Sequence, residues 1–393
     1  MEPIYSAVLL RYGEIGIKSK QTRRRMTNIL VRHLKTALKQ KGISFSNVRN
    51  EYGRIFIETE EAMKAAEATA QVFGIVSTSP VYVLTSNLDD IISTGFDIAS
   101  RDFSKELTFA VRARRVGEHE YTSQSIREGL GERIFEELNI PVDLNNPDQP
   151  ITVEVRDDAA YIFTESIKGV GGMPTGTQGK VVCTVSTGLD SPIAAYKVMK
   201  RGAIPVFVYF DNAPYTGEGC TELAIRQATV LANFIYDFDV KLYIVPHGPD
   251  LDEARCHADE RKICVMCKRN MLRLAREVAI RENADAIVTG EIIGEQASQT
   301  TANLKAISGV VTDFPVLRPL AGDDKVDIER FAQKIGTYKF AQEGLSCCTL
   351  APQYPALNAK HEELAEIDAN MDLDIIKQEV DNARVIILKS KKG

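Results

Sequence analysis

The sequence predicts a multidomain chain that joins an α+β part to a C-terminal α/β part built on a doubly wound parallel sheet. Three observations predict this. Residues 4–84 follow the order β-α-β-β-α-β, strands alternate with helices from residue 180 onwards, and a Gly- and Thr-rich stretch at 168–179 separates the two patterns. A chain of 393 residues has room for roughly two to four domains.

The first 84 residues predict a ferredoxin-like arrangement element by element. Residues 4–10 have a strand pattern, and residues 21–41 predict a helix because their apolar residues are spaced three and four apart. That apolar face consists of Met26, Ile29, Leu30, Leu34 and Leu38. The remaining elements are strands 43–48 and 54–57 across a turn at Tyr52 and Gly53, helix 60–73, and strand 80–84.

Residues 88–165 predict a second α+β segment. It contains helices 88–104 and 123–138, a strand at 107–112, and a hairpin formed by 151–156 and 159–165. The strand at 107–112 ends in a cluster of positive charge formed by Arg112, Arg114 and Arg115.

From residue 180 the chain predicts βαβ units and therefore a parallel sheet. The expected strands are 180–185, 206–210, 242–245 and 286–289, and the expected helices are 191–200, 221–235 and 267–281. The chain ends in Lys389, Lys391 and Lys392, which we expect to form a short solvated basic tail.

Composition excludes several classes of protein. Hydrophobic residues make up 44% and charged residues 26%, as in ordinary globular proteins. No stretch is long and apolar enough for a membrane span, and the N-terminus lacks a secretory signal, so we expect a cytoplasmic protein without membrane association. The cytosol disfavours structural disulfides, so the seven cysteines are buried small residues, metal ligands or groups for sulfur chemistry.

Charge is distributed unevenly along the chain. The net charge is −6, but residues 1–60 carry 12 Lys and Arg against 5 Asp and Glu. A basic N-terminal segment on an acidic body indicates a module that binds a polyanion. Its centre is Arg23, Arg24 and Arg25; the alternative is that these residues form a solvated helix face.

The segment 185–192 predicts a phosphate-binding loop. It follows an apolar strand and opens a helix, so backbone N–H groups and the positive end of the helix dipole would face an anion. Ser186 and Ser191 add hydroxyl donors, and Pro192 suits the first helical turn. The alternative is an ordinary Ser/Thr helix cap.

Two further motifs support a ligand site. The segment 289–300 (Thr-Gly-Glu-Ile-Ile-Gly-Glu-Gln-Ala-Ser-Gln-Thr) again follows a strand, and loops at the carboxyl ends of parallel strands converge on one crevice. The third motif runs from Arg318 to Lys325 and continues to Lys334-Ile-Gly-Thr337. For Lys325 the alternative is a surface lysine that follows a turn.

The pattern Ser186-x-Gly188-x-Asp190-Ser191 resembles the PP-loop of the N-type ATP pyrophosphatases, although Thr187 stands where that family has the first of two glycines. That family splits ATP between the α and β phosphates and adenylates a carbonyl oxygen. With the other motifs and the segments 11–18 and 171–176, nearly the whole chain resembles the tRNA 4-thiouridine synthetases (tRNA sulfurtransferases), in the archaeal-type form without a rhodanese domain. The resemblance implies a ferredoxin-like domain at 1–60, a THUMP RNA-binding domain at 61–168, a linker at 169–179, and a PP-loop ATP pyrophosphatase domain at 180–393.

The resemblance also implies the nucleotide-binding residues. Asp190 would orient Mg²⁺ or the uridine, and Lys325 would lie near the reacting phosphates. Lys325 and Lys268 would offset charge that develops on pyrophosphate. The residues expected to contact ATP are Thr184, Val185, Ser186, Gly188, Asp190, Ser191, Tyr209, Phe210, Lys268, Gly290 and Gln299.

For sulfur chemistry, the resemblance points to Cys347, which matches the family's cysteine, and leaves Cys348 as an extra. Cys264 and Cys267 form a Cys-x-x-Cys pair at the start of a helix. Together with Cys347 they would hold a [4Fe–4S] cluster whose open iron binds sulfide. The alternatives are persulfide and disulfide chemistry without a metal, zinc with His257 as fourth ligand, or unrelated buried cysteines.

These expectations combine into an ATP-dependent tRNA sulfurtransferase that adenylates the uridine at position eight and replaces O4 with sulfur. An external donor would supply the sulfur, and the resemblance implies a homodimer. One alternative is a PP-loop enzyme that acts elsewhere, including on a different tRNA nucleotide; the other is a non-catalytic tRNA-binding protein. The residues expected to contact tRNA phosphates are Arg23, Arg24, Arg25, Arg112, Arg114, Arg115 and Lys168.

Overall fold

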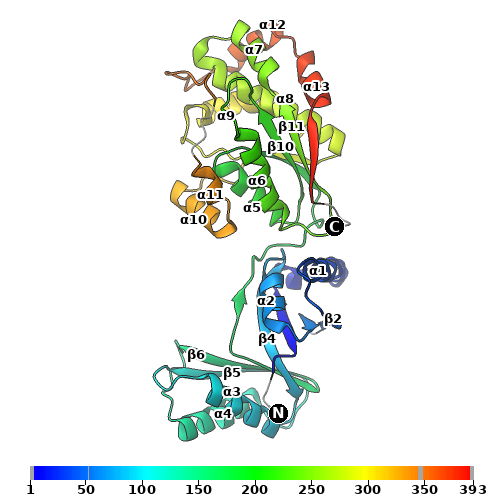
Figure 1. The fold of residues 1–393 in the computed structure, drawn as a ribbon, viewed down its shortest axis with the longest axis vertical. Helices are drawn as coiled ribbons and strands as arrows, with labels where there is room; N and C mark the ends of the chain where they lie inside the picture. Colours follow the sequence, from blue (N-terminus) through cyan, green and yellow to red (C-terminus); the bar gives the residue numbers. More distant parts are fainter. Residues whose placement is uncertain (1–3, 52, 344–347, 390–393) are drawn as a thin grey trace. The chain divides into compact units, whose positions relative to one another are not determined.

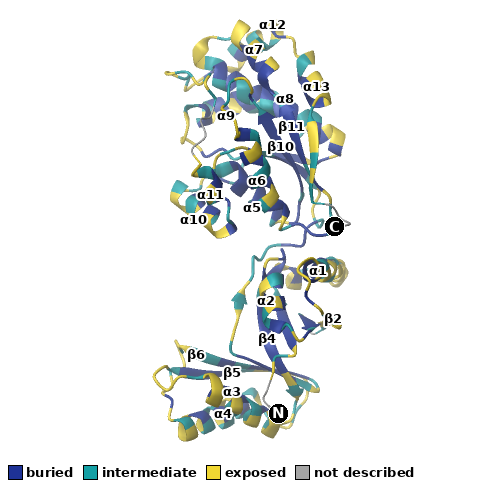
Figure 2. Cartoon of the chain, viewed as in Figure 1, coloured by how far each residue is buried: buried dark blue, intermediate teal, exposed yellow. Residues whose placement is uncertain are grey.

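The structure is a computed structural model that describes residues 4–51, 53–343 and 348–389. The chain divides into two compact units, Met1–Met173 and Pro174–Gly393. Each unit has its own sheet (Figure 1) and its own buried core (Figure 2). The division falls within the Gly- and Thr-rich stretch at 168–179. Within the described ranges, no helix combines the length and the apolar character that crossing a membrane requires.

The N-terminal unit is built on an eight-stranded sheet of order β2-β3-β1-β4-β7-β6-β5, with β8 paired to β4. Its strands are β1 (Ala7–Tyr12), β2 (Asn47–Glu51), β3 (Arg54–Glu58), β4 (Ile75–Thr85), β5 (Phe109–Val116), β6 (Gln149–Arg156), β7 (Ala159–Phe163) and β8 (Ile167–Lys168). The long strand β4 pairs with β1 through residues 75–81 and with β7 through residues 82–85. It therefore belongs to both halves of the unit.

Four α-helices cover this sheet: α1 (Lys20–Gln40), α2 (Ala62–Ala70), α3 (Leu88–Asp102) and α4 (Ser123–Leu138). Helix α1 begins where the Ser19 side chain accepts a hydrogen bond from the Thr22 N–H, which satisfies a free donor of the first turn. The predicted apolar face of α1 is buried at Met26, Leu30, Leu34 and Leu38. The spacing rule therefore identified this helix and its inner face correctly.

The order β1-α1-β2-β3-α2-β4 is the predicted ferredoxin-like arrangement. Helix α2 packs against β1 and α1, and β4 pairs with β1, so the arrangement extends to the end of β4. The predicted boundary at residue 60 lies inside it. Strand β4 also begins earlier than predicted. Along one edge of β4, residues 77–78 pair with β8 and residues 82–85 pair with β7. Pro80 lies between these two segments. The N–H that proline lacks is tolerated there, because that edge is changing partner.

The C-terminal unit is built on a six-stranded sheet of order β13-β12-β9-β10-β11-β14. The strands are β9 (Lys180–Val185), β10 (Ile204–Asp211), β11 (Val240–Pro246), β12 (Ala286–Val288), β13 (Val316–Leu317) and β14 (Arg384–Lys389). The first five are parallel, as the alternation of strands and helices predicted.

Helices cover both faces of this sheet (Figure 1). They are α5 (Asp190–Met199), α6 (Cys220–Ala232), α7 (Gly248–His257), α8 (Ile263–Glu282), α9 (Thr301–Ser308), α10 (Lys325–Ile335), α11 (Tyr338–Ala341), α12 (His361–Asn370) and α13 (Asp374–Asp381). Helix α8 packs Leu272, Leu274 and Val278 against Val206 and Val208 of β10 in one buried core. Each completely buried Leu or Val side chain contributes about 1.5–3 kcal/mol relative to an exposed one.

Strand β14 was not predicted. It pairs antiparallel with β11, so the last described residues extend the sheet instead of forming a solvated tail. Lys389 lies over the Tyr236 ring, with Nζ 4.4 Å from the ring centroid. Lys391 and Lys392 lie outside the described residues.

The order of the strands locates a switch point. From β9 the chain continues to β10 and β11 on one side, and later returns to place β12 on the other side of β9. In open α/β sheets, ligands bind at the carboxyl ends of the strands where the order reverses in this way. The loops after β9 and β12 meet at this position.

Candidate active site

The loop after β9 is compact, and its residues are accessible. The Ser186 N–H donates a hydrogen bond to Ser191 Oγ (2.8 Å), the two hydroxyls are 2.8 Å apart, and the Gly188 N–H donates to Ser186 Oγ (3.2 Å). Ser186 and Gly188 are exposed, and α5 begins at Asp190. Thr187 is not among the residues with positive φ, so this position does not require glycine. Thr187, at the position where the PP-loop family has the first of two glycines, therefore does not strain the backbone of this loop.

The loop after β12 touches the first loop. A Cβ added to Gly290 would lie 2.7 Å from Ser191 N and 2.8 Å from Ser191 Cα. Only glycine allows this approach, because real Cβ atoms essentially never lie so close to backbone. Further along the loop, Gln299 Oε1 accepts a hydrogen bond from the Ile292 N–H (3.2 Å), so this side chain also shapes the loop from inside.

Lys325 connects both loops to α10. Its Nζ lies 2.7 Å from Asp190 Oδ1 and 2.6 Å from Glu295 Oε1. Burial raises the pKa of the Asp190 carboxyl, although Lys325 opposes that rise. Burial also acts against the charged form of Lys325, but the two carboxylates outweigh it and raise the pKa of the ammonium group. One cation thus joins two carboxylates beside the phosphate-type loop.

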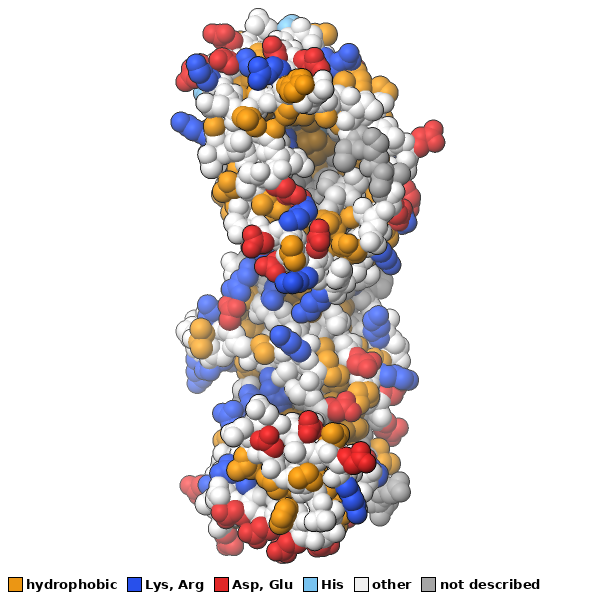
Figure 3. All heavy atoms as spheres, turned by 90° about the vertical axis from the view of Figure 1, so that its left-hand side faces the viewer, with side chains coloured by type: hydrophobic (Ala, Val, Ile, Leu, Met, Phe, Trp, Pro, Cys, Tyr) orange, Lys and Arg blue, Asp and Glu red, His pale blue; other side chains and the backbone are white. Residues whose placement is uncertain are grey.

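These loops border a cavity of about 420 Å³. Such a volume suits a small-molecule ligand, for which cavities of about 300–1,000 Å³ are typical. In Figure 3 the C-terminal unit shows a hollow with hydrophobic side chains on its floor. The cavity lining includes all of the predicted nucleotide contacts: Thr184, Val185, Ser186, Gly188, Asp190, Ser191, Tyr209, Phe210, Lys268, Gly290 and Gln299. The structure brings these residues together, and their contact with ATP stays a prediction.

The Cys-x-x-Cys pair lines the same cavity from the start of α8. Burial raises the pKa of the Cys264 thiol to about 11 and that of the Cys267 thiol to about 12. Burial likewise lowers the pKa of Lys268 beside them, and the charge of Lys268 only partly offsets the rise in the pKa of the two thiols. Both thiols are therefore neutral around pH 7 without a metal.

Cys347 lies outside the described residues, but Cys348 lines the cavity together with Cys264 and Cys267. Burial raises the pKa of the Cys348 thiol. Its backbone is anchored because the neighbouring Thr349 N–H donates to the Tyr215 carbonyl (2.8 Å). Cys348, which the sequence analysis treated as an extra cysteine, therefore belongs to the candidate site.

The proposed zinc ligand His257 does not lie at this site. Its Nε2 lies 3.2 Å from Glu253 Oε1 on α7, and it is not among the cavity-lining residues. Its side chain pairs within its own helix. Cys183 is buried in β9.

The predicted RNA contacts belong to the N-terminal unit. Arg23, Arg24 and Arg25 are exposed on α1. Arg112 and Arg114 are exposed on the edge strand β5, whereas the half-buried Arg115 donates to the Gly117 carbonyl (2.9 Å). Lys168 is exposed on β8. The structure leaves most of these cations free to meet phosphates, and their role in RNA binding stays a prediction.

Comparison with known proteins follows the same division. The family described as "Thiamine biosynthesis protein (ThiI)" matches residues 176–373, the "ThiI ferredoxin-like domain" matches 7–79, and the "THUMP domain" matches 85–165. A probable tRNA sulfurtransferase of Methanosarcina mazei is 36% identical over 389 residues, which cover 98% of this chain and 96% of the relative. This chain belongs to the ThiI family.

Other members of the ThiI family and solved structures agree. A probable tRNA sulfurtransferase of Methanothermobacter thermautotrophicus is 38% identical over 386 residues, with 96% of this chain and 95% of the relative covered. A crystal structure described as a 4-thiouridine synthetase–RNA complex with bound ATP superposes with a TM-score of 0.87 and 31% identity, and covers 98% of this chain and all of that one. PH1313 from Pyrococcus horikoshii gives a TM-score of 0.66 at 26% identity, with 84% of this chain and 99% of that chain covered.

In this ThiI-family chain, sequence reasoning missed residues that only the fold brings together. Glu295 lay in a quoted motif, but its contact with Lys325 depends on how two distant loops meet. In the N-terminal unit, three arginines surround Glu154. Their guanidinium nitrogens lie 3.1 Å (Arg11), 3.4 Å (Arg54) and 3.0 Å (Arg156) from the Glu154 carboxylate oxygens. No local signal could have found this cluster, because Arg11 and Glu154 lie 143 residues apart.

Proposed function

We propose that this chain is an ATP-dependent tRNA sulfurtransferase that converts a uridine, at position eight of tRNA, to 4-thiouridine. The observation that carries the proposal is the contact between the loops after β9 and β12, with Lys325 joined to both Asp190 and Glu295 beside them. Relatives named probable tRNA sulfurtransferase, and the ATP-bound synthetase–RNA complex, support this assignment.

The reaction has two steps. The uridine O4 attacks the α-phosphorus of ATP, the bond to the bridging oxygen breaks, pyrophosphate leaves, and the uridine N3 proton goes to solvent. A sulfur nucleophile then adds to C4, and AMP leaves with the former O4. The loop N–H groups around Gly188 would hold phosphate oxygens, and Lys325 would offset the charge that develops on pyrophosphate.

Asp190 and Glu295 suit a role at Mg²⁺. Two carboxylates already share one cation, and Mg²⁺ prefers such hard oxygen ligands together with phosphate oxygens. We propose that Asp190 and Glu295 hold Mg²⁺ when ATP binds, and that Lys325 turns towards the phosphates. Mg²⁺ would supply charge stabilisation for the leaving pyrophosphate.

The cysteine side of the cavity fits a metal group. Two thiols on one helix start and a third from a distant loop face a largely apolar space, and burial keeps the Cys264 and Cys267 thiols protonated near pH 7 without a metal. We propose that Cys264, Cys267 and Cys347, or its neighbour Cys348, hold a [4Fe–4S] cluster, whose open iron would present sulfide. The competing proposals are persulfide chemistry at these cysteines and a zinc site.

The basic residues on α1 and β5 would hold tRNA through its phosphates. We further propose an external sulfur donor and a homodimer. The exposed edge strand β14, with Val385 and Ile387 at its surface, is compatible with contact to a second copy. Light scattering of the purified protein tests the dimer.

The test of the main proposal uses purified protein, ATP, unmodified tRNA and a sulfide source. Wild type should release pyrophosphate and AMP only when tRNA is present, and Asp190→Ala should abolish this while leaving tRNA affinity within a few-fold. A binding-only protein would release no pyrophosphate. Mass spectrometry of digested tRNA locates the thiolated nucleoside, so thiolation elsewhere would favour the alternative of a different nucleotide.

A further inference from the structure

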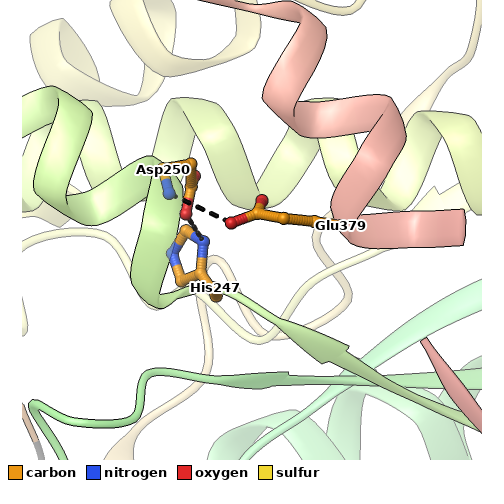
Figure 4. Close-up of side chains that lie close together, drawn as sticks. All are labelled: His247, Asp250 and Glu379. Atoms are coloured by element: carbon orange, nitrogen blue, oxygen red, sulfur yellow. Dashed lines mark hydrogen bonds and ion pairs between the residues drawn. The ribbon is translucent and has the colours of Figure 1, made fainter. Parts of the chain in front are cut away.

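A buried cluster of three polar residues contacts Cys267. It consists of His247, Asp250 and Glu379, whose exposed fractions are 0%, 0% and 3%. His247 follows β11 at the start of α7, Asp250 lies in the first turn of α7, and Glu379 belongs to α13. Figure 4 shows the Asp250 carboxyl group directed at the His247 ring, and the Asp250 backbone nitrogen joined to the Glu379 carboxyl group. Side chains of these types are rarely so completely buried unless they are paired.

The distances describe direct contacts between these residues and not a metal site. His247 Nδ1 lies 2.6 Å from Asp250 Oδ1, and the backbone N–H of Asp250 donates to Glu379 Oε1 at 3.0 Å. Two donors on one tetrahedral metal ion lie about 3.3 Å apart when each metal–ligand bond is about 2.0 Å. The imidazole and carboxylate are too close for that arrangement, so Nδ1 contacts Asp250 directly.

Burial raises the pKa of Glu379 to about 8, and the charge of Asp250 adds to that rise. Glu379 therefore keeps its proton near neutral pH.

The ring has little freedom to turn. The backbone N–H of His247 donates to the Asp211 carbonyl (2.8 Å), which fixes the main chain, and the Phe210 ring packs against the imidazole at a centroid distance of 5.7 Å. With Nδ1 held by Asp250, the other nitrogen faces α8: Nε2 lies 3.3 Å from Cys267 Sγ. That contact is a hydrogen bond whichever of the two atoms carries the proton.

We propose that His247 is a positioning residue for Cys267: its ring, held by Asp250 and Glu379, hydrogen-bonds Sγ and fixes this sulfur at the cavity wall beside Cys264. The inference rests on the proposed function, since it assigns Cys267 to the sulfur chemistry. The arrangement carboxylate–imidazole–ligand atom is the kind of outer support that orients ligands around metal centres, where its loss lowers metal affinity about 10–100-fold.

Nitrogen NMR of the metal-free protein tests the hydrogen bond itself. Long-range ¹H–¹⁵N spectra resolve imidazole nitrogens, and the chain has only five histidines. Cys267→Ala should shift the Nε2 signal of His247, whereas Cys264→Ala should leave it in place. An unchanged His247 signal in Cys267→Ala would overturn the proposal, whatever the fate of the sulfurtransferase assignment.

Titration of metal-free, reduced protein with Co²⁺ tests the consequence, with sulfur-to-cobalt absorption as the readout. His247→Ala should weaken Co²⁺ binding about 10–100-fold, and Asp250→Asn should weaken it in the same direction. The matched control His257→Ala should bind like wild type, because His257 pairs with Glu253. Circular dichroism of each variant verifies folding.

The two readouts separate the failures. Equal Co²⁺ affinity in folded His247→Ala and wild type would contradict the positioning role. A wild type that binds no Co²⁺ through cysteine would contradict the proposed metal site, and the NMR result would still decide whether His247 holds Cys267.

Discussion

Replacing Gly290 with alanine tests whether the two loops form one site. The new Cβ would lie 2.7 Å from Ser191 N, against ordinary contacts of 3.4 Å or more, so one loop must move by at least about 0.7 Å. A displacement approaching 1 Å at a reacting group costs about 10²-fold in rate. We therefore expect tRNA-dependent pyrophosphate release to fall by about two orders of magnitude.

The assay measures pyrophosphate release at saturating ATP and tRNA, with ATP and tRNA affinities measured separately. Stability should fall by only about 1–3 kcal/mol, the usual cost of overpacking. Gly322→Ala is the matched control, because a Cβ there meets nothing within 4 Å and the residue lies in the loop before Lys325. If Gly290→Ala keeps wild-type activity, the loops after β9 and β12 do not act together on ATP.

Three further predictions concern other parts of the chain. Arg112→Ala should weaken binding of all tRNAs alike and reduce the slope of log affinity against log salt by about 1. Anaerobically purified wild type should contain iron and sulfide, and Cys264→Ala should lose both. Glu282→Gln should lower the free energy of unfolding at pH 7 by about 1–2 kcal/mol, because hydrogen bonds from Lys241, Tyr243 and Lys180 outweigh the burial of Glu282 and lower its pKa to about 2, while solvent around the two lysines screens part of that effect.

The sign of the Glu282 effect follows from the depressed pKa. The stabilisation is complete above the unfolded pKa of about 4.5 and disappears as pH falls towards about 2. The difference between wild type and Glu282→Gln should therefore shrink over that interval, and a constant difference would contradict the assignment. For the tRNA-binding prediction, a change in which tRNAs Arg112→Ala prefers would indicate that this residue reads bases. For the cluster prediction, a wild-type protein that is active without iron would exclude the cluster.

Local patterns predicted what depends on local physics. The spacing in α1 identified its buried face, and the strand-turn-helix around Gly188 predicted a loop followed by a helix from residue 191, one residue after the observed start of α5 at Asp190. The approach of Gly290 to that loop followed from a general rule about carboxyl ends of parallel strands.

Features that depend on pairing between distant segments were missed. Strand β14 has exposed Val385 and Ile387 on an edge, so its pattern lacks the buried run that marks the central strands. The contact of His247 with Cys267 joins the residue that precedes α7 to α8, whereas the sequence analysis named His257 as the possible fourth zinc ligand. The cluster of arginines at Glu154 arises because β1, β3 and β6 meet in one sheet, which no single segment reveals.

Transfer of an oxygen label tests the central claim most directly. tRNA carrying ¹⁸O at the uridine O4 is incubated with the protein, ATP and a sulfide source, and the released AMP is analysed by mass spectrometry. Adenylation of O4 predicts that AMP acquires one ¹⁸O for each thiouridine formed, and that Asp190→Ala yields neither. Unlabelled AMP alongside thiolated tRNA would contradict the account, because the uridine oxygen would then have left by another route.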